Sequence, residues 1–229
     1  MTTSGTYAYS PSAGELGLTA FRRIGVHGHE LTSQHMSELR NAANLLLAEW
    51  SNQTPNLWEV GLQTQALTAG TATYSVNANT VMMLDVYVTY GSGTTTDRIL
   101  MPISRTEYAS YPNKTQQGVP TVFWFNRIIA PTFTLYPVPD NTFSYTVNYY
   151  SVRQTQDVNV SGADTPEIPY RFLDAFTAGL AWKLAEIFRP ELEDKLYARY
   201  MRAWGIAATQ DTEGVPLYLT PGLSGYWRV

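Results

Sequence analysis

The sequence predicts an α+β fold in which an N-terminal and a C-terminal pair of helices form a four-helix bundle that carries an inserted antiparallel β-sandwich or barrel. Apolar residues recur every three or four positions near both ends of the chain, the period of amphipathic helices. In the middle, apolar and polar residues alternate between turn-forming residues, as in half-buried strands. Neither helix pair can bury its apolar face alone, so the pairs are expected to pack together. The expected segments are residues 1–54, 55–165, 166–209 and an extended C-terminal arm, 210–229.

The first helix pair is predicted from apolar spacing and from residues that begin or end helices. A short helix over Glu15–Ile24 is followed by Gly25, at the position where a left-handed cap is needed. Thr32 or Ser33 begins a longer helix, and Pro55 prevents its continuation. The apolar positions are Leu16, Phe21 and Ile24 in the short helix, and Met36, Leu39, Ala43, Leu46 and Trp50 in the long one.

Short strands with regular turns are predicted in the central segment, which is almost free of charged residues. Each apolar run is bounded by Gly, Pro, Asn or Asp, and a chain of such runs is typical of a small sandwich or barrel. The expected strands are Trp58–Leu62, Ala72–Val76, Val81–Tyr90, Ile99–Ile103, Val122–Arg127, Thr132–Pro137 and Phe143–Tyr149.

The second helix pair follows the sheet. Pro169 suits the first turn of a helix, and Arg189-Pro190 ends that helix and begins the next, whose pattern stops near Ala208. The apolar stripes are Phe172, Phe176, Leu180, Leu184 and Ile187, then Leu192, Leu196, Tyr200 and Trp204. The predicted core of the bundle consists of Phe21, Leu39, Leu46, Trp50, Phe176, Leu180, Leu184 and Trp204.

Composition excludes several classes of protein. Charged residues make up 15% of the 229 residues, against about 25% in ordinary soluble domains. The absence of cysteine excludes disulfides, thiolate nucleophiles and cysteine-based metal sites. A net charge of −4 argues against binding to duplex DNA through a basic face. The sequence shows no targeting signal and no apolar run near the roughly 18 residues of a membrane span. A soluble protein made in the cytoplasm, without membrane contact, is therefore expected.

No catalytic residue, metal ligand or cofactor is predicted. His27, His29 and His35 lie close in sequence, but their spacing does not place two of them one turn apart on a helix, as a zinc protease motif requires. A polar loop with His35 in the first turn of a helix is favoured over a loop-borne metal site. Acidic residues are the other candidates. Solvation explains those on one helix face (Glu191, Glu193, Asp194), and a few are scattered through the sheet segment (Glu59, Asp85, Glu107).

Two aromatic regions are unlike those of an ordinary isolated domain. Consecutive aromatic residues in the sheet, such as Phe123-Trp124-Phe125, must face both sides of a strand, so some point away from the local core. Either they face the bundle or they form a protein–protein surface, where Tyr and Trp are enriched. The candidates for that surface are Tyr90, Tyr111, Phe123, Trp124 and Phe125. The C-terminal arm is expected to dock on a neighbour through Leu217, Tyr218, Leu219, Leu223, Tyr226 and Trp227.

The helical segments carry a family resemblance. Residues 19–26 (TAFRRIGV), the helix end LLLAEW at 45–50 and Leu57-Trp58 resemble the head-to-tail adaptor (head completion, or connector) proteins of tailed bacteriophages, especially those of short-tailed phages. Gly118-Val119-Pro120 followed by Phe123 and Trp124 is similar to the insert strands of adaptors that carry a sheet domain. Ile168-Pro169 is similar to the start of their third helix.

The resemblance implies a structural virion protein at the head–tail junction. Such adaptors form a homo-oligomeric ring of twelve copies under the portal protein, and the ring extends the DNA channel, so that double-stranded DNA passes without specific binding. The C-terminal arm would grip the portal, and the aromatic sheet would meet the tail nozzle or hub. Two alternatives from other classes are a carbohydrate-binding β-sandwich module and a cell-wall-degrading virion enzyme.

Overall fold

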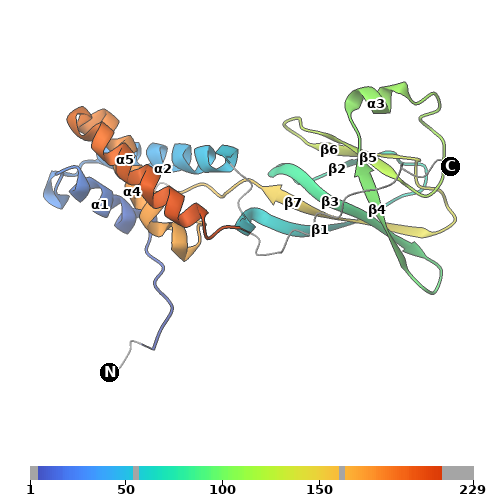
Figure 1. Ribbon diagram of the computed structural model, residues 1–229, viewed down its shortest axis with the longest axis horizontal. Helices are drawn as coiled ribbons and strands as arrows, with labels where there is room; N and C mark the ends of the chain where they lie inside the picture. Colours follow the sequence, from blue (N-terminus) through green and yellow to red (C-terminus); the bar gives the residue numbers. More distant parts are fainter. Residues whose placement is uncertain (1–4, 54–56, 160–162, 213–229) are drawn as a thin grey trace, which may run out of the picture.

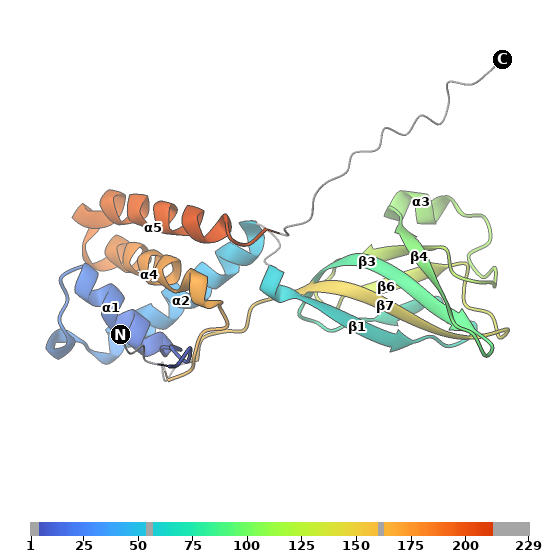
Figure 2. The same ribbon diagram turned by 60° about the horizontal axis from the view of Figure 1, so that its bottom comes forward.

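The computed structural model describes residues 5–53, 57–159 and 163–212 and shows two lobes side by side, a helical bundle and a β domain. Figures 1 and 2 show the bundle at one end of an elongated molecule and the strands at the other. The chain passes from the bundle into the β domain after the second helix and returns before the fourth. The predicted α+β fold with an inserted β domain is therefore confirmed.

Helices α1 (Ala13–Arg23) and α2 (Ser33–Gln53) form the N-terminal pair. Ser12 begins α1 with a capping box, in which its hydroxyl accepts from the backbone N–H of Glu15 and the Glu15 carboxylate accepts from the backbone N–H of Ser12. Gly25 has a φ of 80°, the left-handed conformation that the sequence predicts after the helix. A short 3₁₀ turn, Gly28–Glu30, leads into α2.

Helices α4 (Leu173–Phe188) and α5 (Glu193–Ala208) form the C-terminal pair, each after a 3₁₀ turn, Tyr170–Phe172 and Pro190–Leu192 respectively. Helix α4 lies at the centre of the bundle and contacts α1, α2 and α5. The buried surface of α4 is therefore wider than the single apolar stripe that the sequence predicts. Its buried residues cover most of its circumference: Ala175, Phe176, Thr177, Ala178, Gly179, Leu180, Ala181, Leu184 and Ala185.

The predicted stripe of α4 is wrong at its last position. Ile187 is 53% exposed, whereas the next residue, Phe188, packs its ring against Phe21 and against the imidazole of His35, 4.6 Å away between centroids. The last turn of α4 meets α1 and the start of α2, so the buried face there is rotated by one residue relative to the stripe.

The core of the bundle contains the aliphatic and aromatic side chains that the periodicity singled out. Seven of the eight are at most 5% exposed: Phe21, Leu39, Leu46, Trp50, Phe176, Leu180 and Leu184. Trp204 is partly buried, with its ring 4.7 Å from that of Trp50 and 5.3 Å from that of Phe172. The Trp50 indole Nε1 donates a buried hydrogen bond of 3.0 Å to the Tyr200 hydroxyl, so this aromatic cluster leaves neither polar atom unsatisfied.

The β domain is a seven-stranded curled sheet in the order β1-β7-β3-β4-β5-β6-β2. The strands are β1 (Val60–Ala66), β2 (Thr73–Ser75), β3 (Thr80–Gly91), β4 (Thr96–Pro102), β5 (Val122–Asn126), β6 (Thr132–Tyr136) and β7 (Ser144–Arg153). Its own core lies inside the curl and includes Val88, Leu100, Phe133, Leu135 and Val147.

One strand pair differs from the predicted antiparallel arrangement. Strands β4 and β5 run parallel, with Met101 opposite Val122. The reason is the long connection between them, because parallel neighbours need a crossover and cannot be joined by a tight turn. That connection contains a helix, α3 (Arg105–Ser110), which Ser104 caps and which the sequence interpretation missed. The capping pattern of Ser104 followed by Glu107 was the available signal.

The first strand begins later than predicted. Trp58 lies in a 3₁₀ turn, Leu57–Glu59, and its ring packs on Phe172 at 4.6 Å between centroids. It therefore belongs to the bundle.

Within the described part of the chain, no helix is both long and apolar enough to cross a membrane.

Close helix packing at Gly179 predicts a measurable cost of a larger side chain. A Cβ atom built on Gly179 of α4 would lie 2.6 Å from Leu46 Cδ2, and Leu46 is fully buried. Gly179→Val is expected to lower the free energy of unfolding by about 1–3 kcal/mol because the core is overpacked. Urea denaturation followed by helical circular dichroism measures the change. The matched control is Gly205→Ala on α5, where nothing lies within 4 Å. It is expected to stabilise by up to about 1 kcal/mol, and a neutral Gly179→Val would contradict the packing argument.

Tyr200 predicts that alkaline pH destabilises the bundle. Burial raises the pKa of the Tyr200 hydroxyl to about 12, whereas a tyrosine in an unfolded chain titrates near a pH of about 10. Folding therefore favours the neutral phenol. The stability from this group is fully present below a pH of about 10 and is lost as the pH rises towards about 12.

Tyr200→Phe separates this titration from the hydrogen bond to Trp50. The variant is expected to lose less stability between pH 10 and 12 than the wild type. At pH 7 it is expected to be less stable by about 1–3 kcal/mol, because the Trp50 Nε1 loses its acceptor. Denaturation curves across this pH range measure both effects. The exposed Tyr197 supplies the control, Tyr197→Phe, and parallel pH profiles for wild type and Tyr200→Phe would count against the assignment.

Candidate interaction surfaces

The acidic and histidine side chains of the described residues do not gather into a metal site. Among residues 5–53, 57–159 and 163–212, no three such side chains come together in a way that could hold a metal ion. His27 and His29 stack on each other at the surface, 5.9 Å apart. His35 lies at the start of α2, where its Nδ1 is 3.2 Å from the backbone N of Thr32 and its ring packs on Phe188. The three histidines therefore lie in the turn that leads into α2 and in the first turn of that helix.

The other carboxylates that the sequence singled out are distributed over separate elements. Glu191 lies in the 3₁₀ turn before α5, and Glu193 and Asp194 lie in the first turn of α5, where negative charge interacts favourably with the helix dipole. The three carboxylates of the central segment are dispersed: Glu59 is buried beside the bundle, Asp85 is exposed in β3 and Glu107 is exposed in α3.

The predicted aromatic contact surface is only partly exposed. Phe123 is wrong as a surface residue, because it is 2% exposed and belongs to the core of the β domain. Tyr90 and Phe125 are partly buried and pack against the same core. Trp124 and Tyr111 remain on the outer side of the sheet. Strand alternation explains the split, since Phe123 and Phe125 point to one face of β5 and Trp124 to the other.

Trp124 and Tyr111 belong to two separate ring stacks that attach α3 to the sheet. The Tyr108 ring stacks on Trp124 at 5.6 Å, and Tyr111 stacks on Tyr136 at 4.3 Å. Lys114 lies 5.7 Å above the Tyr108 ring centre. The rings therefore cover one another, and Tyr108 occupies one face of the Trp124 indole. This arrangement does not favour an open stacking platform for a sugar.

Exposed aliphatic side chains on the β domain are stronger candidates for a contact surface. In β4, Leu100 points into the core while its neighbours Ile99 and Met101 are 73% and 63% exposed. The turn between β5 and β6 carries Ile128 and Ile129, and Ile129 is 99% exposed. The sequence interpretation missed all four because it weighed aromatic residues only. Strict alternation around Leu100 and two consecutive isoleucines in a turn were the available signals.

The bundle also exposes apolar residues, chiefly on its outer helices. The large apolar side chains that exceed a third exposure on α2, α4 and α5 are Leu45, Ile187, Tyr197, Met201 and Ile206. The extended segment before α1 adds Tyr7 and Tyr9. Single exposed apolar residues are ordinary on protein surfaces, but here they occur on both lobes of a chain with few charged residues.

The predicted arm residues Leu217, Tyr218, Leu219, Leu223, Tyr226 and Trp227 lie outside the described residues. The described chain ends at Thr212, just beyond Asp211. The Asp211 carboxylate accepts a 3.1 Å hydrogen bond from the backbone N–H of Leu57 and pairs with the Arg171 guanidinium. The described chain therefore ends beside the start of the β domain.

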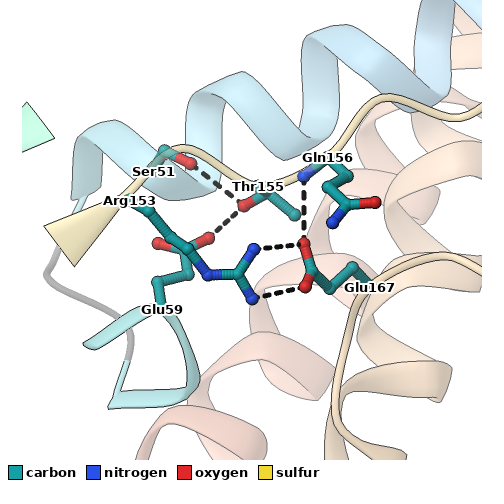
Figure 3. A network of polar contacts seen from close by, with 6 residues as sticks. All are labelled: Ser51, Glu59, Arg153, Thr155, Gln156 and Glu167. Atoms are coloured by element: carbon teal, nitrogen blue, oxygen red, sulfur yellow. Dashed lines mark hydrogen bonds and ion pairs between the residues drawn. The ribbon is translucent and has the colours of Figure 1, made fainter. Parts of the chain in front are cut away.

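A polar network joins the two lobes (Figure 3). Glu59, which is 1% exposed, comes from the segment that enters β1, and Thr155 from the segment that leaves β7. The Thr155 hydroxyl donates to the Glu59 carboxylate and lies 3.2 Å from the Ser51 hydroxyl on α2. Because Thr155 has one proton and gives it to the carboxylate, Ser51 is the donor of the second bond. Three distant segments thus meet at one buried point.

An ion pair next to this point fixes the returning chain. Arg153, at the end of β7, binds both carboxylate oxygens of Glu167, with Nη1 to Oε2 at 3.0 Å. The hydrogen bonds from Arg153 lower the pKa of the Glu167 carboxyl, and the backbone N–H of Gln156 adds to this effect. Further along, the Asn44 side chain bonds the backbone N and O of Val158, which is buried in the bundle core.

Residues 14–220 match the family described as SU10 adaptor protein. No curated protein matches the chain.

The junction predicts that one hydroxyl contributes substantially to stability. Thr155→Val keeps the shape of the side chain but removes the donor to the buried Glu59 carboxylate. The free energy of unfolding is expected to fall by about 1.5–3 kcal/mol, the usual size for a hydrogen bond to a charged group. The control is Thr96→Val, at an exposed position of β4, with an expected change within about 0.5 kcal/mol. Thermal denaturation compares the two variants, and equal melting temperatures would contradict the role of Thr155.

Proposed function

Because the chain belongs to the SU10 adaptor protein family, a family of phage structural adaptors and not of enzymes, we propose that it forms the ring that connects head and tail in a tailed phage virion. One observation carries the proposal: the match runs from α1 through the inserted β domain and α5, so it includes both lobes and the junction between them.

In the proposed ring, copies of the bundle pack side by side below the portal, twelve to a ring, and continue the DNA channel. The elongated subunit supports this arrangement, since its two ends differ in architecture and can meet different partners (Figure 2). The net charge of −4 per chain supports a lumen that binds phosphates weakly. DNA would then slide through, because every tight phosphate contact opposes its passage.

The two proposed contacts lie at different places on the chain. The C-terminal arm, with Leu217, Tyr218, Leu219, Leu223, Tyr226 and Trp227, would contact the portal. The β domain would contact the tail nozzle or hub. The exposed side chains Ile99, Met101, Ile128 and Ile129 support the second contact better than the predicted aromatic residues, because Phe123 is buried and Trp124 is stacked on Tyr108.

Imaging the purified chain mixed with purified portal rings tests the proposal. The expected result is added ring-shaped density on one face of the portal. Tyr226→Ala/Trp227→Ala is expected to weaken attachment at least about tenfold, the loss of about 1.4 kcal/mol or more that large interface aromatics typically cause. Ile128→Asp/Ile129→Asp, on the β domain, is the control that should keep portal attachment. If the wild-type chain leaves portal rings bare at high concentration, the proposal fails.

A further inference from the structure

Strand β1 forms a long open edge of the sheet. It pairs with β7 through seven consecutive residues, from Val60 opposite Val152 to Ala66 opposite Thr146, without a register shift. It is the first strand in the order of the sheet, so no described strand lies on its other side. The backbone N–H of Leu67 donates to the Tyr145 carbonyl. Backbone N–H groups alternate in direction along a strand, so those of Gly61, Gln63 and Gln65 point towards β7 like that of Leu67. The N–H groups of Leu62, Thr64 and Ala66 therefore point away from β7, towards the open side.

This edge lacks the features with which proteins usually protect open strands. Such features are charged side chains, proline, bulges or a very short strand. The β1 sequence, Val-Gly-Leu-Gln-Thr-Gln-Ala, contains no charge and no proline. The opposite edge of the same sheet, β2, is only three residues long. The protein therefore protects one edge by shortness and leaves the other open to pairing.

An apolar pair lies on the outer face beside this edge. Leu62 of β1 and Tyr150 of β7 are directly opposite each other and are 49% and 40% exposed. The next pair on the same face is polar, with the Thr64 hydroxyl donating to the Asn148 side chain. A strand added next to β1 would cover Leu62 with its own side chains and use the outward N–H groups.

The chain itself delivers a suitable segment to this place. Asp211 is bonded to the backbone of Leu57, three residues before β1 begins, and 17 residues follow Thr212. Among them, Leu217-Tyr218-Leu219-Thr220 is uncharged and rich in residues that favour strands. Proline stands on both sides of these four residues, where it is tolerated in an edge strand. The four residues between Thr212 and Leu217 reach up to about 14 Å, at about 3.4 Å each.

We propose that residues 217–220 pair with β1 of the same chain as an added edge strand. A segment that extends along the edge from this point would run parallel to β1, because the described chain ends beside the beginning of that strand. Attachment to the same chain raises its effective concentration at the edge to about the millimolar range. The inference needs only the open edge and the exit point of the chain, and it does not depend on the proposed portal contact. Contact of residues 217–220 with another protein would first require them to leave β1.

Amide hydrogen exchange by NMR on the full-length chain tests the pairing. The amides of Leu62, Thr64 and Ala66 are expected to exchange at least about tenfold more slowly in the wild type than in Leu219→Pro, which removes a strand N–H. Ser224→Pro, in the same C-terminal segment but outside residues 217–220, is the matched control and should behave as the wild type. Unchanged exchange in β3 and α4 shows that both lobes stay folded.

Two results would overturn the proposal. Equal exchange of the three amides in the wild type and in Leu219→Pro would show that residues 217–220 do not cover the edge. Protection that increases with protein concentration would show that the segment of a second copy occupies β1, which contradicts pairing within one chain. Attachment to portal rings is measured separately, with the variant at Tyr226 and Trp227, so failure of one proposal leaves the other standing.

Discussion

Helix α4 lies at the centre of the bundle, where α1 and α2 cover it from the N-terminal half of the chain and α5 covers it from the C-terminal half. Leu180 and Leu184 are fully buried, and α4 packs so closely on Leu46 that there is no room for a side chain at Gly179. Helices separated by more than a hundred residues of sequence must therefore meet before any of them is stable, since isolated short helices are marginal in water. The β domain, which is inserted between α2 and α4, therefore has to begin and end next to the bundle.

The junction satisfies that requirement with polar and apolar contacts together. Trp58 on the way out and Val158 on the way back are packed into the bundle, so the crossover segments are extensions of the helical core. The Thr155–Glu59 bond and the Arg153–Glu167 pair join them to each other and to the bundle. A buried carboxylate is costly unless it is bonded, so this arrangement favours one orientation of the β domain. A fixed orientation suits a component that spaces two different partners in an assembly.

Local periodicity accounts for most of the predicted elements. The spacing of Leu39, Leu46 and Trp50, by seven and then four positions, follows from the period of the helix itself. The capping function of Gly25 is equally local. The sequence predicts less well which side chain points to the core where that depends on a neighbouring element. Ile187 and Phe188 are adjacent, and only the contact with Phe21 and His35 decides that Phe188 is the one that packs against the core. Phe123 and Trp124 pose the same problem in β5, because alternation separates them without saying which face is the core.

The sequence by itself determined the order of elements, the two amphipathic pairs and the lack of charge in the sheet, because these follow from side-chain type and spacing along a single strand or helix. Only the tertiary structure decided the parallel pairing of β4 with β5, the transfer of Trp58 to the bundle and the open edge of β1. The same is true of the junction, since Ser51, Glu59 and Thr155 are about a hundred residues apart at their extremes. Long-range pairing depends on how the lobes close around their cores, and no local pattern encodes that closure.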